Sequence, residues 1–359
     1  MIHIHKFLPG YRHSFELKYQ DILKHNGIAY QVVDSHDAKF WDDLVGSRLF
    51  IMFLGQTQMH LQRQINLITT IDRYLKIPCF PNWDMVWHFD DKVAQQHLLE
   101  AMSFPVAKSH VFWNKELALE WADKTSYPKV FKLKGGAGSL NVVIVNSQRH
   151  ANLLINKMFS KGIRSGRVPG VDLLSIFRGS YKTMFKSYLK ELLYDIGARS
   201  STIEDWSRHQ GYAYFQDFLP GNTYDTRVTV IGDRAFGFLR HNRHNDFRSS
   251  GSGNIDFTPD RVDMRMIKAA FKISQALNFQ TMAYDFLFDA KREPVVNEMC
   301  CQFADWAIYQ CPGFWDADLN WHEGHYWPQY LQLQDLLKDD KLKQPSFDLS
   351  NKKSRIIRA

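Results

Sequence analysis

The chain has 359 residues, of which 45% are hydrophobic, and its 26 Phe, 15 Tyr and 10 Trp are enough to fill two or three domain cores. It contains no run of about 18 uncharged apolar residues, and its first ten residues lack the apolar core of a signal peptide, so we expect a cytoplasmic protein. The four cysteines have no CxxC spacing, which argues against a disulfide scaffold and a structural zinc site.

The first ninety residues alternate short apolar runs with helical patterns. We expect strands at residues 2–6, 29–33 and 49–53, and helices at residues 14–25 and 59–75. Residues 77–80 can form a fourth strand, and Pro78 favours an edge position or a strand start there. This order predicts a small parallel α/β domain over residues 1–90.

The pattern changes near residue 90, where we place a domain boundary. The expected elements are helices at residues 92–102 and 264–277, a strand near residues 110–113 and a hairpin over residues 282–299. We assign residues 91–337 to a second unit with a central and a C-terminal subdomain. Residues 338–359 form a polar, basic tail with too few apolar side chains to pack.

A basic helical insertion is predicted at about residues 157–199. This segment contains nine Lys or Arg residues and only three Asp or Glu residues, and the resulting excess of positive charge accounts for most of the net charge of +7. Residues 171–194 read as an amphipathic helix, along which four basic residues follow one another at i+4: Arg178, Lys182, Lys186 and Lys190. Such a stripe attracts an acidic glycan, a nucleotide or a phospholipid surface, and a solvated helix face is the other explanation. We expect no nucleic-acid partner.

A glycine-rich turn follows the strand-like residues 127–132. Lys132 ends that segment, and the turn contains Gly135, Gly136, Gly138 and Ser139. Small residues let backbone N–H groups approach phosphate oxygens, and a nearby lysine neutralises their charge. A purely structural hairpin turn remains an alternative.

Two further segments carry groups suited to a nucleotide. A strand that leaves its sheet after residues 214–219 can offer backbone groups to an adenine edge, and Asp225 can bind ribose hydroxyls. Arg240 and Arg248 on the next strand and loop can clamp phosphate or carboxylate, although a surface arginine is more often part of an ion pair.

The third element is an apolar hairpin that contains two acids. Asp285 and Glu298 can face each other across the paired strands. Two such carboxylates repel unless a cation joins them, and hard oxygen ligands next to phosphate suit Mg²⁺. The alternative is a pair of half-exposed edge acids that discourage aggregation.

The glycine-rich turn, the nucleotide segments and the acidic hairpin, in this order, resemble the ATP-grasp superfamily over about residues 90–300. Within that superfamily, the chain most resembles the ribosomal-protein-modifying and glutathione-synthase-like ligases. The resemblance implies an ATP-grasp fold, of the α/β (α+β) class, after a small parallel α/β domain. It implies that Arg240 and Arg248 act on the transferred phosphoryl group and the ATP phosphates, with Asp285 and Glu298 as metal ligands. The implied ATP-binding residues are Lys92, Lys132, Gly135, Gly136, Gly138, Ser139, Gln216, Asp217, Phe218, Leu219 and Asp225.

One position departs from the family pattern. The family usually has Asn two residues after the metal-binding Glu, where this chain has Cys300. Asn297 would lie on the opposite side of a regular strand from Glu298. The metal site is therefore expected to use fewer protein ligands or to recruit another residue.

The resemblance implies an ADP-forming ligase that joins a carboxylate to an amine through an acyl phosphate, with ATP and Mg²⁺. Residues 311–315 and 319–324 also resemble ATP-grasp proteins associated with surface-polysaccharide synthesis, which suggests a uronic acid or acidic glycan as the carboxylate. Core packing explains the aromatic residues there as well as glycan stacking does. The rival functions are a nucleotide-binding regulator without turnover and a kinase on the same fold.

Overall fold

The computed structural model describes residues 1–6, 11–12, 14–136, 141–165, 168, 208–243, 246–249, 253–347 and 357–358. The predicted basic stripe lies outside these residues, as do two members of the glycine-rich turn, Gly138 and Ser139.

The first layer is a parallel four-stranded sheet with the strand order β3-β1-β4-β5. Its strands are β1 (Ile2–His5), β3 (Tyr30–Val33), β4 (Leu49–Met52) and β5 (Cys79–Phe80). The accompanying helices are α1 (Ser14–His25), α2 (Phe40–Asp43), α3 (Gln58–Ile68), the π-helix η1 (Thr69–Tyr74) and α4 (Trp83–Val86). The predicted parallel layer is confirmed, and β5 lies at its edge, as Pro78 indicated. The helix expected at residues 59–75 consists of α3 continued by the π-helix.

The second layer is an antiparallel sheet with the order β6-β11-β7-β8. Its strands are β6 (Ser109–Phe112), β7 (Lys129–Lys132), β8 (Val142–Val145) and β11 (Ala213–Asp217). Its helices are α5 (Lys92–Ala101), α6 (Lys115–Lys124) and α7 (Gln148–Met158), and a small ladder joins β9 (Ile163–Arg164) to β10 (Arg208–His209). Asp91 caps α5, because its carboxylate accepts the backbone N–H groups of Val93 and Ala94.

The third layer is a seven-stranded sheet with the path β16-β15-β12-β13-β17-β18, to which β14 adds beside β13. Its strands are β12 (Tyr224–Ile231), β13 (Arg234–His241), β14 (Ile255–Asp256), β15 (Thr281–Phe288), β16 (Pro294–Cys300), β17 (Gly313–Asp316) and β18 (Trp321–Glu323). Its helices are the 3₁₀-helix η2 (Pro259–Arg261), α10 (Met264–Ala276), α11 (Asp305–Gln310) and α12 (Pro328–Leu337).

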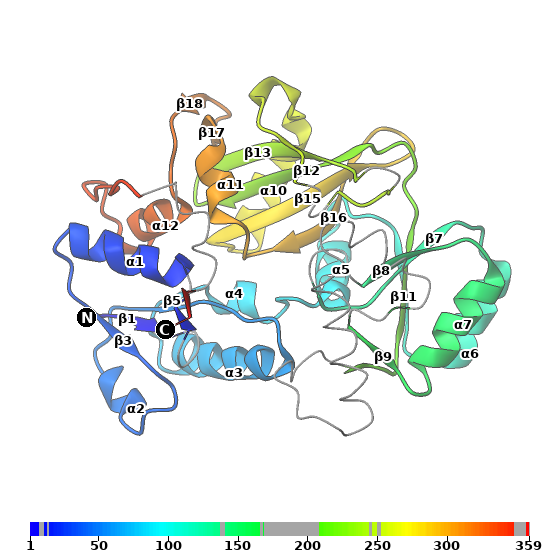
Figure 1. Ribbon diagram of the computed structural model, residues 1–359, viewed down its shortest axis with the longest axis horizontal. Coiled ribbons are helices and arrows are strands. Elements are labelled where there is room, and N and C mark those ends of the chain that lie inside the picture. The colour runs from blue at the N-terminus through cyan, green and yellow to red at the C-terminus, as the bar shows by residue number, and fades with distance from the viewer. Residues whose placement is uncertain are drawn as a thin grey trace.

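The described residues form three hydrophobic cores, and two of them show how the layers are joined. The larger core runs from the first sheet into the third, where buried side chains such as Ile51 and Phe286 belong to one cluster. A separate core packs α6 and α7 against the second sheet. Figure 1 shows the second sheet with α6 and α7 at one end of the molecule and the first sheet at the other. The second and third sheets therefore approach each other without sharing a core.

In the C-terminal segment, residues 338–359, some side chains pack against the rest of the protein although the composition of the segment is polar. Leu342 is 4% exposed in the larger core, and Phe347 packs edge-on against Trp327. At the end of the chain, β19 (Ile357–Arg358) pairs with β2 (Tyr11–Arg12). The expectation that residues 338–359 lack packing side chains is therefore wrong for Leu342 and Phe347, because single well-placed apolar groups suffice.

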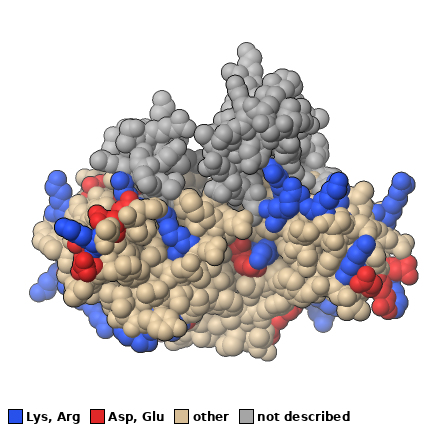
Figure 2. Space-filling view, turned by 90° about the horizontal axis from the view of Figure 1, so that it is seen from below, with Lys and Arg blue, Asp and Glu red and all other residues tan. Residues whose placement is uncertain are grey.

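The surface shows two further properties. Among the residues that the structure describes, no helix combines the length and apolar character needed to cross a membrane. On the face shown in Figure 2, Lys and Arg lie in several separate groups, and Asp or Glu lies beside some of them.

Candidate active site

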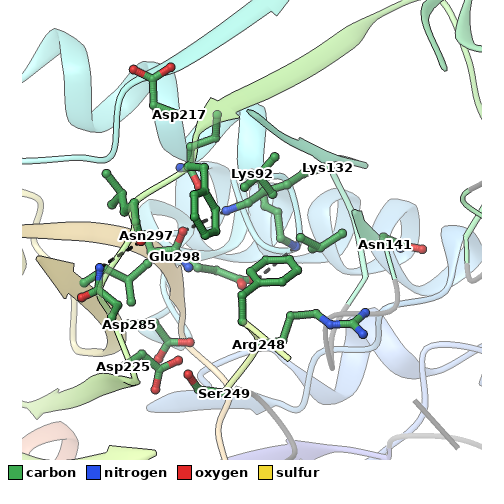
Figure 3. Close-up of a pocket in the computed structure, with 18 of the residues that line it drawn as sticks. Lys92, Lys132, Asn141, Asp217, Asp225, Arg248, Ser249, Asp285, Asn297 and Glu298 are labelled. Atoms are coloured by element: carbon green, nitrogen blue, oxygen red, sulfur yellow. Dashed lines mark hydrogen bonds and ion pairs between the residues drawn. The ribbon is translucent and has the colours of Figure 1, made fainter. Parts of the chain in front are cut away.

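An open pocket of about 930 Å³ of empty space, part of it open solvent, lies between the second and third sheets. Most residues proposed from the sequence contribute to its lining: Lys92, Lys132, Gly136, Gln216, Asp217, Phe218, Leu219, Asp225, Arg248, Asp285 and Glu298. Asn297 and Asn141 also line it (Figure 3). The fold therefore brings these residues together from five separate segments of the chain.

The two pocket lysines have different partners. Lys92 Nζ donates to the carbonyl oxygen of Gly136 at 2.8 Å and lies 3.1 Å from Glu298 Oε1. Lys132 Nζ donates to Asn297 Oδ1 at 2.9 Å. Lys92 is thus paired with a carboxylate, whereas Lys132 is held by a neutral amide.

This difference shows in their pKa values. Burial lowers the pKa of Lys132 to about 8, and the attraction of Glu298 offsets the loss of hydration in part. Burial also disfavours the charged form of Lys92, but Glu298 and Asp90 together leave its pKa above the ordinary value. Lys132 is therefore a buried ammonium whose charge is incompletely compensated in the free protein.

A β-bulge in β16 corrects the expected position of Asn297. Asp285 pairs with Glu298, but the next residue, Phe286, pairs with Val296, so Asn297 is the extra residue. Val296 and Met299 are buried on the core side, whereas Asn297 and Glu298 both line the pocket. The prediction that Asn297 and Glu298 point to opposite faces of the sheet is wrong, because it assumed that side chains alternate between the faces without interruption along β16. The predicted facing of Asp285 and Glu298 is confirmed.

Side chains from other elements hold the start of the glycine-rich turn. The backbone N–H of Gly136 donates to both carboxylate oxygens of Asp90, at 2.9 and 3.0 Å, and Lys134 Nζ lies 3.0 Å from Asp91 Oδ2. Gly136 has φ +101°, and a Cβ there would collide with the Asn141 side chain. Burial raises the pKa of Asp90 to about 6. Gly136 is therefore required by its conformation, and Gly135 lies beside it next to Asp90.

A network of two arginines and two aspartates lies on the pocket face of the third sheet. Arg240 on β13 binds Asp225 through two bonds, of 2.7 and 2.6 Å, and also lies 2.6 Å from Asp285 Oδ2. Arg227 on β12 binds Asp285 through two bonds, of 2.7 and 2.8 Å. Asp225 and Asp285 line the pocket, whereas Arg240 bridges the two carboxylates. In this structure Arg240 therefore neutralises two site carboxylates.

Sequence reasoning missed Arg227. It stands two residues after Asp225, so both side chains project from the same face of β12. Its register partner across the sheet is Asp285. The Asp-x-Arg spacing on a predicted strand was the available signal, but the sequence does not reveal which carboxylate the arginine meets.

The two aspartates respond differently to the network. Burial alone would raise the pKa of Asp285, but Arg227 and Arg240 together hold it below its usual range. The pKa of Asp225 is raised, because burial outweighs the attraction of Arg240 and the charge on Asp285 opposes its ionisation. Asp285 is therefore the more firmly ionised of the two.

The proposed adenine side of the pocket follows the end of β11. Gln216 is buried, while Phe218 and Leu219 follow the strand and line the pocket. The Phe218 ring meets Phe247 edge-on at 6.1 Å between centroids. Asp217 accepts from Lys129 Nζ at 2.6 Å, so its carboxylate is neutralised by the protein.

Arg248 enters the pocket from the loop after β13. Its Nε and Nη2 donate to the Asp246 carboxylate, at 2.9 and 2.6 Å. This local pair fixes the arginine at the pocket lining, where its side chain is 8% exposed.

The donor set at the hairpin fits a small hard cation. Asp285 and Glu298 offer carboxylate oxygens on facing residues, whereas the amide oxygen of Asn297 already accepts a hydrogen bond from Lys132. The described residues contain no cluster of three or more His, Cys, Asp or Glu side chains suited to a metal. Mg²⁺ usually takes one or two protein carboxylates and completes its shell with water and phosphate, so this set fits Mg²⁺ bound together with a nucleotide.

Comparisons with known proteins identify the fold. No protein-family model matches the sequence, and no curated protein matches it. Among solved structures, the chain is similar to N5-carboxyaminoimidazole synthetase from Staphylococcus aureus, with 13% identity and a TM-score of 0.55 over 96% of this chain and 78% of that one. It is also similar to the biotin carboxylase domain of 2-oxoglutarate carboxylase from Hydrogenobacter thermophilus, solved with MgADP, with 11% identity and a TM-score of 0.56 over 94% and 70%.

A third likeness is to N5-carboxyaminoimidazole ribonucleotide synthetase from Thermotoga maritima, with 12% identity and a TM-score of 0.54 over 97% of this chain and 77% of that one. Identities this low establish the fold alone. The expected fold class is confirmed: the chain has the mixed α/β architecture of these proteins.

Proposed function

We propose that this protein is an ADP-forming carboxylate-amine ligase that uses ATP and Mg²⁺. The observation that carries the proposal is the convergence of Lys92, Lys132, Asp285 and Glu298 on one pocket between two sheets. Cationic groups for phosphates and oxygen ligands for a cation are the two requirements of phosphoryl transfer. The fold is shared with proteins whose names describe a synthetase and a biotin carboxylase domain.

In this proposal the adenine lies against the segment from Gln216 to Leu219, and the phosphates extend toward Lys92, Lys132 and Gly136. Asp285 and Glu298 would hold Mg²⁺, and the ion would supply positive charge next to the phosphates. Arg248 reaches the phosphates from its loop, and Arg240 orients Asp225 and Asp285. The carboxylate substrate receives the terminal phosphoryl group, and the amine displaces phosphate from the resulting acyl phosphate.

The finer proposal concerns the substrate. The carboxylate that the sequence suggests is a uronic acid or acidic glycan in surface-polysaccharide synthesis. In this proposal the protein acts in the cytoplasm, and its basic stripe contacts the glycan or the surface of a membrane. The aromatic residues near the C-terminus add little support, because Trp315 packs against Trp321 at 4.8 Å and is 7% exposed.

One observation favours a second candidate, a nucleotide-binding regulator without turnover. Both expected metal ligands are already paired with cations of the protein: Asp285 with Arg227 and Arg240, and Glu298 with Lys92. A site neutralised in this way can bind nucleotide phosphates without strong metal binding.

A product assay separates the candidates. The purified chain is incubated with ATP, Mg²⁺, a panel of uronic acids and acidic oligosaccharides, and ammonia, amino acids or amino sugars. A ligase releases ADP and phosphate only when both substrates are present, and mass spectrometry detects the amide. ATP binding without ADP release from any pair would favour the regulator, and a stable phosphorylated product formed without amine would identify a kinase.

A further inference from the structure

The bulge in β16 places two unlike side chains next to each other at the pocket. In a regular strand Asn297 and Glu298 would point to opposite faces of the sheet. Here both line the pocket, while the flanking Val296 and Met299 are 0% and 1% exposed in the core. The extra residue therefore adds a polar group to the pocket without removing an apolar group from the core.

Each of these two residues holds one of the pocket lysines. Glu298 pairs with Lys92, and Asn297 accepts the hydrogen bond from Lys132 (Figure 3). Lys132 ends β7 in the second sheet, whereas Asn297 belongs to the third sheet. The hydrogen bond thus spans the space between the two sheets at the pocket.

We propose that Asn297 is a positioning residue that holds the Lys132 ammonium toward the nucleotide phosphates while leaving its charge available to them. The inference rests on the proposed function and assigns to that site a residue that the family pattern does not place there. An amide oxygen orients the ammonium by one hydrogen bond and carries no charge. A carboxylate at this position would form an ion pair with Lys132 and would repel the phosphates.

Burial explains why such a residue is needed. Lys132 is 4% exposed, and a buried ammonium without an acceptor is strongly disfavoured. Without Asn297, the lysine side chain would turn toward Glu298, whose carboxylate already attracts its ammonium group. In that conformation Lys132 would neutralise a metal ligand instead of a phosphate.

The test measures ATP affinity without metal. ATP and adenosine are titrated into the full chain in EDTA, for the parent and for Asn297→Ala and Asn297→Asp. Both variants should weaken ATP binding about tenfold, because hydrogen bonds to charged groups have this magnitude, and should leave adenosine binding within about twofold. Asn26→Ala is the matched control, because it also loses side-chain hydrogen bonds but lies in the N-terminal layer. It should not change either affinity.

A double-mutant cycle separates positioning from a general structural effect. In a Lys132→Met background, Asn297→Ala should cause no further loss of ATP affinity, because the group that it positions is absent. Equal losses in both backgrounds would overturn the inference. It would also be overturned if Asn297→Ala left metal-free ATP binding unchanged but weakened Mg²⁺ binding, with Asn297→Asp strengthening Mg²⁺ binding, since that pattern identifies a metal ligand.

Inorganic tripolyphosphate distinguishes failure of this inference from failure of the proposed function. A parent chain that binds tripolyphosphate but not ATP would refute the nucleotide function. In that case the role of Asn297 would hold only if its variants weakened tripolyphosphate binding. A parent chain that binds neither anion would overturn both.

Discussion

Arg227 binds Asp285 in a bidentate manner, with Nε 2.7 Å from Oδ1 and Nη2 2.8 Å from Oδ2. The two residues are register partners on β12 and β15, so the pair lies directly across the sheet. Arg240 approaches the same carboxylate from β13. The expected repulsion between the hairpin acids is therefore already relieved in the free protein, because cationic side chains lie beside Asp285 and Glu298.

The first prediction concerns the stability of the free protein, to which this arginine network should contribute. Asp285→Asn leaves the buried Arg240 and the partly buried Arg227 with Asp225 as the remaining carboxylate of the network, so the free protein should lose about 3 kcal/mol of unfolding free energy. Glu298→Gln should be milder, because the Glu298 side chain is 35% exposed and Lys92 keeps its bond to Gly136. Urea unfolding of the metal-free variants measures the difference.

The same two variants test the metal assignment. Both remove one anionic oxygen ligand while keeping its shape, so both should abolish most ADP formation under conditions where they remain folded. A Glu298→Gln protein with full ligase activity would refute a metal at this hairpin. If Asp285→Asn proved as stable as the parent, the arginine network would not be stabilising.

A second prediction concerns Lys132. Lys132→Ala removes the charge next to the proposed phosphate position and should weaken ATP binding at least tenfold, or about 1.4 kcal/mol. Calorimetric titration measures the affinity, and Lys124→Ala, at an exposed lysine of α6, is the matched control. Unchanged ATP affinity would remove Lys132 from the site.

The lowered pKa of Lys132 leads to a third prediction. With a pKa of about 8 in the free protein, part of the lysine is neutral at slightly alkaline pH. Bound phosphate favours the ammonium and raises this pKa, so ATP binding should take up a proton at about pH 8.5 and weaken as the pH rises further. Calorimetry in two buffers with different ionisation enthalpies detects the uptake, which Lys132→Ala should abolish. Equal heats for the parent in both buffers would contradict the prediction.

Local patterns in the sequence were sufficient for much of the fold. The helix at residues 14–25 has the predicted bounds. The pairing of Asp285 with Glu298 was expected, but it depends on the bulge, because an unbroken register from the Phe286–Val296 pair would place Asn297 opposite Asp285. The glycine-rich turn and its two flanking strands were recognisable for the same reason, since their signals are local.

Features that depend on tertiary contacts were not predictable. A bulge adds one residue without a distinct composition, so the position of Asn297 required the observed register. The arginine network required knowledge of which strands become neighbours, because β12 lies between β13 and β15. Leu342 packs although its segment is polar, since burial depends on the surface that a single side chain meets.

The last prediction concerns Cys300, which stands where the family has an asparagine. Its register partner is Ala283, and it follows Glu298 by two residues on β16. Burial raises the pKa of its thiol to about 12, with further contributions from Glu298 and Asp90 that Arg227 opposes in part. The side chain is therefore a neutral thiol at physiological pH, and a thiol is a poor ligand for Mg²⁺.

Cys300→Ala should accordingly keep the parent's ADP formation, and Cys300→Asn should keep it or increase the affinity for Mg²⁺ by adding a hard oxygen near Glu298. The measurement is the ratio of ATP dissociation constants with and without Mg²⁺, which isolates the metal's contribution from that of the lysines. Cys79→Ala, in the first sheet, controls for the loss of a buried thiol elsewhere. A tenfold loss of turnover in Cys300→Ala at unchanged stability would show that the thiol takes part in the reaction. If Cys300→Asn increases Mg²⁺ affinity while Asn297→Ala leaves it unchanged, the metal and lysine roles at β16 belong to different residues.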